Sequence, residues 1–121
     1  MGTLTADQAF TWLAAKDGRN FNGAALKGKL KSTISDIESA SGDTSTGGGN
    51  TRYTFNGAAS YHESNGVGIN GGVSIFYVKR PGNVAKIIAM GYHIGAQTYQ
   101  LTWVHHDWTR MRGVNTITLD K

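Results

Sequence analysis

Apolar residues recur at helical spacing in the first third of the chain. Thr5 and Gln8 have the spacing of a capping box, and Gly18 is typical of a helix end. The apolar residues between them fall on one helical face: Ala9, Phe10, Leu13 and Ala14. A second stripe recurs every three or four residues after a possible N-cap at Asn22: Leu26, Leu30, Ile34 and Ile37. The pattern predicts two amphipathic helices within residues 1–42.

From residue 51 the pattern is typical of short strands. Residues 51–55 and 58–62 flank Asn56-Gly57, a strong two-residue hairpin signal. Further strand-like runs are separated by glycine-containing loops: 73–79, 84–94, 99–106 and 114–119. We therefore predict an α+β fold, with two N-terminal helices packed on a twisted antiparallel β-sheet of four to six strands.

The chain is predicted to be a single domain spanning residues 1–121. Its helical part occupies residues 1–42 and its sheet residues 51–121. The small polar residues and glycines of 43–50 predict a flexible connection between the two.

The loop positions predict a register for the central strands. With Pro81-Gly82 and residues 95–98 as turns, Phe76 should lie opposite Ile87 and His93 opposite Gln100. In the earlier hairpin, Arg52 should lie opposite Tyr61.

Because strand side chains alternate, this register sorts the central strands into two faces. The large apolar residues should face the helices: Val73, Ile75, Tyr77, Ile88, Met90, Tyr92, Tyr99, Leu101 and Trp103. The other face should carry Ser74, Phe76, Val78, Ala85, Ile87, Ala89, Gly91, His93, Gln100, Thr102, Val104 and His106. Small residues in its middle predict a shallow depression open to a substrate.

The charge balance suggests an anionic partner. The chain has 12 Lys and Arg against 8 Asp and Glu, and residues 73–121 hold six basic residues against two acidic ones. A basic sheet that carries histidines favours nucleic acid, although a charge of this size also serves solubility. No apolar run reaches about 18 residues, so no membrane span is predicted. The lack of cysteine excludes disulfides and thiol chemistry.

Several classes of catalytic site are disfavoured. His93, His105, His106 and Asp107 have ligand chemistry, but neighbours on a strand point to opposite faces, so we predict no metal. Neither GxSxG nor GxGxxG occurs, and no cofactor is predicted.

Metal-independent RNA cleavage matches the remaining residues. Histidine can take the proton of the 2′-hydroxyl and return one to the leaving 5′-oxygen, and Lys or Arg can stabilise the phosphorane. The candidate catalytic residues are His93, Thr98, Thr102 and His106. The candidate RNA-binding residues are Arg52, Lys79, Arg80 and Gln100. A structural, hydrogen-bonded role for each histidine is the alternative.

A resemblance to a known family is carried by residues 75–103, IFYVKRPGNVAKIIAMGYHIGAQTYQLTW. The run resembles the C-terminal sheet of ribonuclease toxins of the barnase, EndoU, colicin and RelE-like superfamily, especially the C-terminal domains of contact-dependent and polymorphic bacterial toxins. Gly91-Tyr92-His93, the turn 95–98 and the alternating Tyr99, Leu101 and Trp103 carry it. The His-His-Asp that follows Trp103 departs from the pattern.

The resemblance implies a metal-independent endoribonuclease that cleaves tRNA or other cellular RNA. It also implies delivery into a target-cell cytoplasm as part of a larger secreted bacterial toxin, and a cognate immunity protein. His93 would be the general acid or base, and Thr98 or Thr102 would contact phosphate. The main alternative is a non-catalytic binding module, such as an adaptor, immunity-like or sugar-binding domain, with aromatic contacts at Tyr53, Tyr61, Trp103 and Trp108. An enzyme acting on another anionic substrate, such as a nucleotide, is a third possibility.

Overall fold

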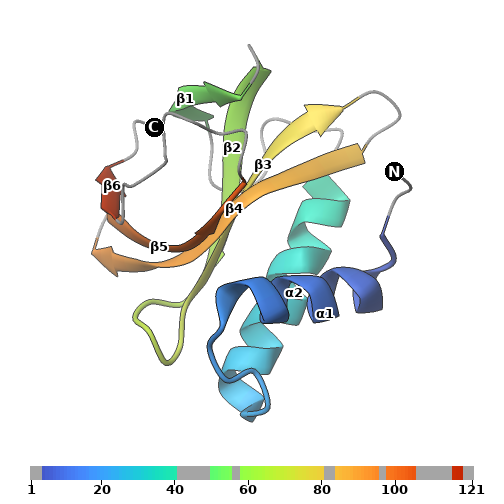
Figure 1. The fold of residues 1–121 in the computed structure, drawn as a ribbon, viewed down its shortest axis with the longest axis vertical. Coiled ribbons are helices and arrows are strands. Elements are labelled where there is room, and N and C mark those ends of the chain that lie inside the picture. Colours follow the sequence, from blue (N-terminus) through green and yellow to red (C-terminus); the bar gives the residue numbers. More distant parts are fainter. Residues whose placement is uncertain are drawn as a thin grey trace.

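The computed structural model describes residues 4–40, 50–55, 58–80, 84–95, 98–105 and 116–118. The elements in chain order are α1 (Ala6–Asp17), α2 (Ala24–Ala40), β1 (Asn50–Phe55), β2 (Ala58–Asn65), β3 (Val73–Arg80), β4 (Val84–Gly95), β5 (Thr98–Val104) and β6 (Thr116–Thr118). The strands form one antiparallel sheet in the order β1-β2-β3-β4-β5-β6. The predicted α+β fold is confirmed, with both helices preceding the sheet (Figure 1). Most of the predicted connection 43–50 lies outside the described residues, and its last residue, Asn50, begins β1.

The ends of α1 follow directly from the sequence. The Thr5 hydroxyl accepts a hydrogen bond from the Gln8 amide at 3.2 Å, and the Thr5 amide donates to the Gln8 side chain at 2.9 Å. This is the predicted capping box, which satisfies amides that the first helical turn leaves without partners. At the other end Gly18 has φ 80°, and its amide donates to the Ala14 carbonyl at 3.2 Å. The left-handed backbone explains why glycine ends this helix.

The second helix buries its predicted stripe but begins later than predicted. Its buried stripe consists of Leu26, Leu30, Ile34 and Ile37. Asn22 is not the N-cap, because the first helical hydrogen bond runs from the Lys27 amide to the Gly23 carbonyl at 3.0 Å. The Asn22 amide instead donates to the Asn20 side chain at 2.9 Å, within the turn that precedes the helix.

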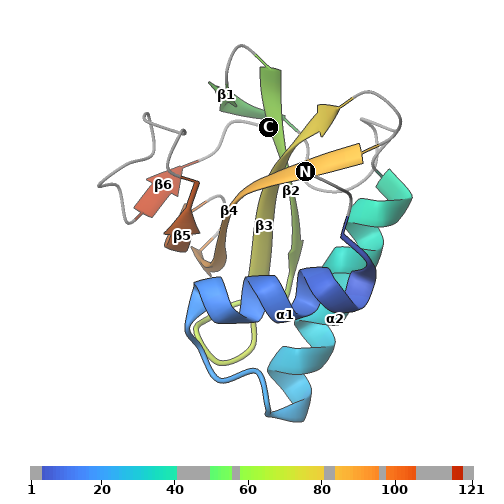
Figure 2. The same ribbon diagram turned by 45° about the vertical axis from the view of Figure 1, so that its right-hand side comes forward.

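Both helices cover the same face of the sheet (Figure 2). The core on this face joins the two helical stripes to alternate residues of β3 and to Met90 of β4: Ala9, Leu13, Phe21, Leu26, Leu30, Ile34, Ile37, Val73, Ile75, Tyr77 and Met90. Trp12 of α1 packs edge-on against Trp103 of β5, with ring centroids 5.1 Å apart. Burial of this apolar surface is the main force that holds the helices on the sheet.

A buried ion pair adds polar contacts at the end of α1. The Arg19 guanidinium contacts both carboxylate oxygens of Asp17, at 2.7 and 3.2 Å. It also donates to the carbonyls of Ile69 and Gly72 at 2.9 and 2.7 Å. Asp17 in turn accepts a hydrogen bond from the Thr102 hydroxyl at 2.6 Å. One charged pair thus ties α1 to the β2–β3 connection and to β5.

The predicted strand register is wrong for two reasons. The β3–β4 ladder begins with the pair Arg80–Val84, one residue away from the predicted alignment, and the ladders contain bulges. Phe76 pairs with Ala89 and Tyr77 with Ile87, which leaves Ile88 as an extra residue of β4. His93 pairs with Tyr99 and not with Gln100. Residue Tyr61 pairs with Asn50 and not with Arg52, because β1 is also irregular. An extra residue on one strand shifts all later pairs, and turn positions alone do not reveal it.

The bulges also change which residues share a face. Val73, Ile75, Tyr77, Met90 and Trp103 face the helices as predicted. Several other placements were wrong. Ile88, Tyr99 and Leu101 belong to a second apolar cluster on the opposite face, whereas Ala85 and Ile87 pack on the helix side.

The predicted shallow depression is not present. Its floor was expected at Ser74, Ala89 and Gly91, and all three residues are buried. A second apolar cluster occupies this face: Phe76, Val78, Ile88, Ala89, Tyr99 and Leu101.

At Gly91, β4 and β5 leave no room for a side chain. A Cβ atom at this position would lie 2.0 Å from the Gln100 carbonyl oxygen. Real Cβ atoms do not come this close to backbone oxygen, so only glycine allows the two strands to pair here. The bulge next to this position leaves Thr102 as the extra residue of β5.

Candidate functional site

Two histidines and a tyrosine meet on the face of the sheet opposite the helices. We call His62 of β2, His93 of β4 and Tyr99 of β5 the histidine–tyrosine cluster. The Tyr99 hydroxyl lies 2.7 Å from His62 Nε2. The rings of His93 and Tyr99 are 4.0 Å apart between centroids and tilted by 38°. Three strands therefore place two imidazoles on either side of one phenol.

The inner part of this cluster is closed to solvent. His62 is 1% exposed and Tyr99 is fully buried. His62 also stacks on the Phe76 ring at 5.7 Å. Burial raises the pKa of Tyr99 to about 12, although a hydrogen bond with Ser64 partly opposes this rise. The Tyr99 phenol therefore stays protonated near neutral pH and can donate a hydrogen bond.

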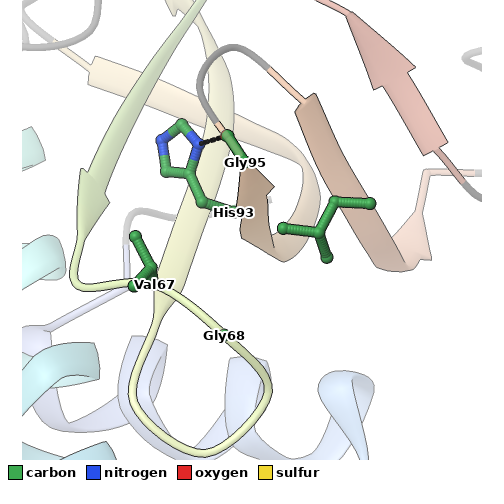
Figure 3. Close-up of a pocket in the computed structure, with 5 residues that line it drawn as sticks. Val67, Gly68, His93 and Gly95 are labelled. Atoms are coloured by element: carbon green, nitrogen blue, oxygen red, sulfur yellow. Dashed lines mark hydrogen bonds between the residues drawn. The ribbon is translucent and has the colours of Figure 1, made fainter.

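Only the outer member of the cluster reaches the surface. His93 is half-buried and lines a hollow of about 450 Å³ together with Val67, Gly68, Ile94 and Gly95 (Figure 3). The Gly68 amide donates to the His93 carbonyl at 2.8 Å, which ties the β2–β3 connection to β4. Val67 and Ile94 are 72% and 53% exposed, so the hollow has an apolar rim.

One hydrogen bond fixes the tautomer of neutral His93. Its Nδ1 lies 3.1 Å from the Gly95 carbonyl oxygen, shown as the dashed line in Figure 3. A carbonyl oxygen can only accept, so Nδ1 carries the hydrogen and donates. Nε2 of the neutral ring then has its lone pair free for a substrate proton. This arrangement can act as a general base.

The other described candidate residues do not gather around His93. Thr102 lies on the helix side, where its hydroxyl contacts Asp17 and the Met90 carbonyl. The Gln100 side chain donates weakly to the Leu101 carbonyl at 3.5 Å. His106, and the side chains of Thr98 and Arg52, lie outside the described residues.

The two described candidate cations lie at the far end of the sheet. Lys79 and Arg80 pair with Ala85 and Val84 at the start of β4. His93 is eight or nine residues further along β4, which at 3.3 Å per residue is roughly 26–30 Å along an extended strand. Lys79 Nζ lies 5.1 Å from the centre of the Tyr61 ring. Neither Lys79 nor Arg80 therefore lies beside His93.

A buried carboxyl lies on the helix side of the sheet. Glu63 is 5% exposed, and its Oε2 has no hydrogen-bond partner within the described part of the chain. Burial, followed by repulsion from Asp36, raises the pKa of Glu63 above its usual 4.5. Burial also raises the pKa of Tyr77 to about 12, with smaller contributions from Glu63 and Tyr61. Among the described residues, no group of three His, Asp or Glu side chains is arranged to hold a metal ion.

Sequence reasoning missed His62 and Tyr99 as site residues. It assigned Tyr99 to the helix face and gave His62 no role. A local signal was present in β2, where Ser60, His62 and Ser64 occupy every second position. Such an alternation places polar groups on one face of a strand. The spatial partner of His62 is 37 residues away and depends on the bulges, so it could not be read locally.

Comparisons with protein-family models, with curated proteins and with solved structures give no match for this chain. Within the described residues, no helix is long and apolar enough to cross a membrane.

Proposed function

We propose that the protein is a metal-independent endoribonuclease of the bacterial toxin type, with His93 as its general base. The observation that carries the proposal is a half-exposed imidazole whose Nδ1 donates to Gly95, which places the lone pair of the neutral ring on Nε2. A general base needs the correct tautomer and an accessible lone pair, and the half-exposed His93 with hydrogen on Nδ1 supports this role. The resemblance of residues 75–103 to ribonuclease toxins supports the same reading.

In this reaction His93 Nε2 takes the proton of a ribose 2′-hydroxyl. The 2′-oxygen bonds to phosphorus, the bond from phosphorus to the 5′-oxygen breaks, and an acid returns a proton to that oxygen. The products are a 2′,3′-cyclic phosphate and a 5′-hydroxyl. His106 is our candidate for the acid.

In this proposal basic residues of the sheet bind RNA and do not take part in proton transfer. The net charge of +4 attracts RNA without regard to sequence. Because the exposed Arg80 lies far along the sheet from His93, we assign it to a phosphate several nucleotides from the cleavage position. Lys79 was also a candidate, but its Nζ is buried over the Tyr61 ring, so we assign it no phosphate. Arg52 and Gln100 remain candidates for RNA contacts. The substrate is tRNA or other cellular RNA, and a cognate immunity protein would protect the producing cell.

The test is cleavage of purified tRNA and total RNA in the presence of EDTA. Replacing His93 with Ala or Gln should lower the rate by about 100-fold or more, since general base catalysis typically contributes that much. His105→Ala is the matched control, because His105 does not line the hollow and should remain active. Full activity of both His93 variants would remove His93 from the mechanism.

The apolar rim of the hollow favours one alternative, a non-catalytic binding module. Val67 and Ile94 expose large apolar areas beside His93. Exposed apolar side chains that gather at a hollow are typical of contact sites. Expression in bacteria separates the two functions: a ribonuclease toxin should be poorly tolerated unless His93 is replaced, whereas a binding module should be harmless and leave RNA intact.

A further inference from the structure

The histidine–tyrosine cluster contains a second histidine that the proposed reaction does not use. His62 is 1% exposed and cannot meet a substrate directly. Its Nε2 is nevertheless 2.7 Å from the hydroxyl of Tyr99, whose ring packs closely on His93. His62 therefore contacts the ring that packs against His93, and a change at His62 can alter the orientation of His93 through Tyr99.

We propose that His62 is a positioning residue, which holds the Tyr99 ring in the orientation on which His93 stacks. The effect on catalysis rests on the proposed function, whereas the contact between His62 and Tyr99 is present whether or not the protein cleaves RNA. The chain of contacts runs from the interior to the surface, from His62 to Tyr99 to His93.

The backbone around Tyr99 explains why a side-chain contact is needed. Tyr99 pairs with His93, and the β4–β5 ladder is irregular on both sides of this pair, between Met90 and Gly91 and between His93 and Gly95. Bulges redirect side chains and interrupt the regular pairing that would otherwise fix their direction. The hydroxyl group of Tyr99 is held by His62 and by Ser64, which is itself 2.8 Å from the Ser74 hydroxyl.

His93 itself has few constraints. Its imidazole has the Gly95 carbonyl at one edge and the Tyr99 ring against one face. The hydrogen bond to Gly95 holds one edge of the imidazole, and the Tyr99 ring against its face helps to set the plane of the ring. Small changes in the plane of a general base lower the rate strongly, because proton transfer requires close alignment.

Three variants test this inference. Tyr99→Phe keeps the ring and removes the hydroxyl, His62→Leu keeps a buried side chain without a hydrogen bond, and His62→Gln keeps a polar group that can reach the hydroxyl. The first readout is the NMR spectrum of protein with ¹⁵N-labelled histidine. In the wild type, the His93 ring protons should be shifted by the Tyr99 ring, and the ring nitrogens should report hydrogen on Nδ1.

Tyr99→Phe and His62→Leu should both reduce that ring-induced shift, and His62→Gln should restore most of it. With an RNA substrate, the first two variants should lower kcat by about tenfold with little change in KM, because alignment is lost without loss of binding contacts. The double variant should be no slower than either single variant, as expected for two residues that act through one contact.

Unchanged His93 resonances in folded Tyr99→Phe would overturn the inference, and so would additive effects in the double variant. If His62→Leu fails to fold, Tyr99→Phe carries the test alone. Absence of RNA cleavage by the wild type would overturn the proposed function and leave the NMR result to decide on the contact. Cleavage by the wild type with unchanged resonances in Tyr99→Phe would retain the function and reject the role of His62.

Discussion

On the face of the sheet that packs against α1 and α2, two sets of polar side chains are tied to one another, whereas the opposite face holds imidazole, phenol and hydroxyl groups. Arg19, Asp17 and Thr102 form one set on the helix side, and Asn65 joins Thr33 and Asp36 in another. The histidine–tyrosine cluster contains no carboxylate. Both faces bury an apolar core, so burial alone does not distinguish them. The helix side therefore holds the paired charges that stabilise the fold, and the opposite face holds the uncharged donors and acceptors on which the proposed proton transfer depends.

The largest effect is expected on the helix side, at Arg19. Replacing Arg19 with Met should lower the free energy of unfolding by about 3–5 kcal/mol, since it leaves the Asp17 carboxylate buried without its partner. Denaturation in urea measures the change. Lys27→Met is the matched control at an exposed position of α2, with an expected change within about 0.5 kcal/mol. Equal stabilities for the two variants would contradict the role of the ion pair.

A smaller effect on stability is expected at Thr102. Thr102→Val should cost about 1–2 kcal/mol, because the buried Asp17 oxygen loses a hydrogen bond. The same variant should cleave RNA at the wild-type rate, since Thr102 faces away from His93. Thr102→Ser retains the hydroxyl and should resemble the wild type in both measurements. A loss of cleavage without a loss of stability would indicate that Thr102 lies on the same face as His93, and it would contradict the pairing of β4 with β5 described above.

The smallest effect is expected at Glu63, and its size depends on pH. The raised pKa means that the folded chain binds this proton more tightly than the unfolded chain, so ionisation of Glu63 destabilises the fold. Below the usual value of 4.5 both states are protonated, and Glu63→Gln should match the wild type. As pH rises above that value, the variant should become the more stable protein. Denaturation at about pH 3.5 and about pH 7 measures the difference, and a difference that does not change with pH would refute the assignment.

Local sequence signals predicted the helices and the order of the strands well. The capping box at Thr5, the glycine at position 18 and the stripe from Leu26 to Ile37 act over a few residues, and the structure contains each of them. The start of α2 was missed because Asn22 resembles a cap in sequence while the turn uses Asn20.

The faces of the sheet were predicted less well, for a physical reason. The extra residues Ile88 and Thr102 each exchange the two faces of the sheet for the residues that follow. No residue type in the sequence predicts such a bulge. Thr102 therefore lies on the helix side and Tyr99 on the opposite face, the reverse of the prediction. The prediction that His93 belongs to the face away from the helices agrees with its contact to Tyr99, but the partner at His62 depends on pairings across three strands.

The pairing of β4 with β5 is sensitive to substitution at Gly91, although Gly91 takes no part in the proposed reaction. A single methyl group there would collide with the Gln100 carbonyl and push the two strands apart. His93 follows two residues later, and its ladder partner is Tyr99, so the damage would reach the ring stack directly. A genetic screen for variants that lack the proposed activity should therefore recover substitutions of Gly91 as readily as those of His93. The Gly91 variants would be inactive because β4 and β5 separate, and the His93 variants because the proton acceptor is missing.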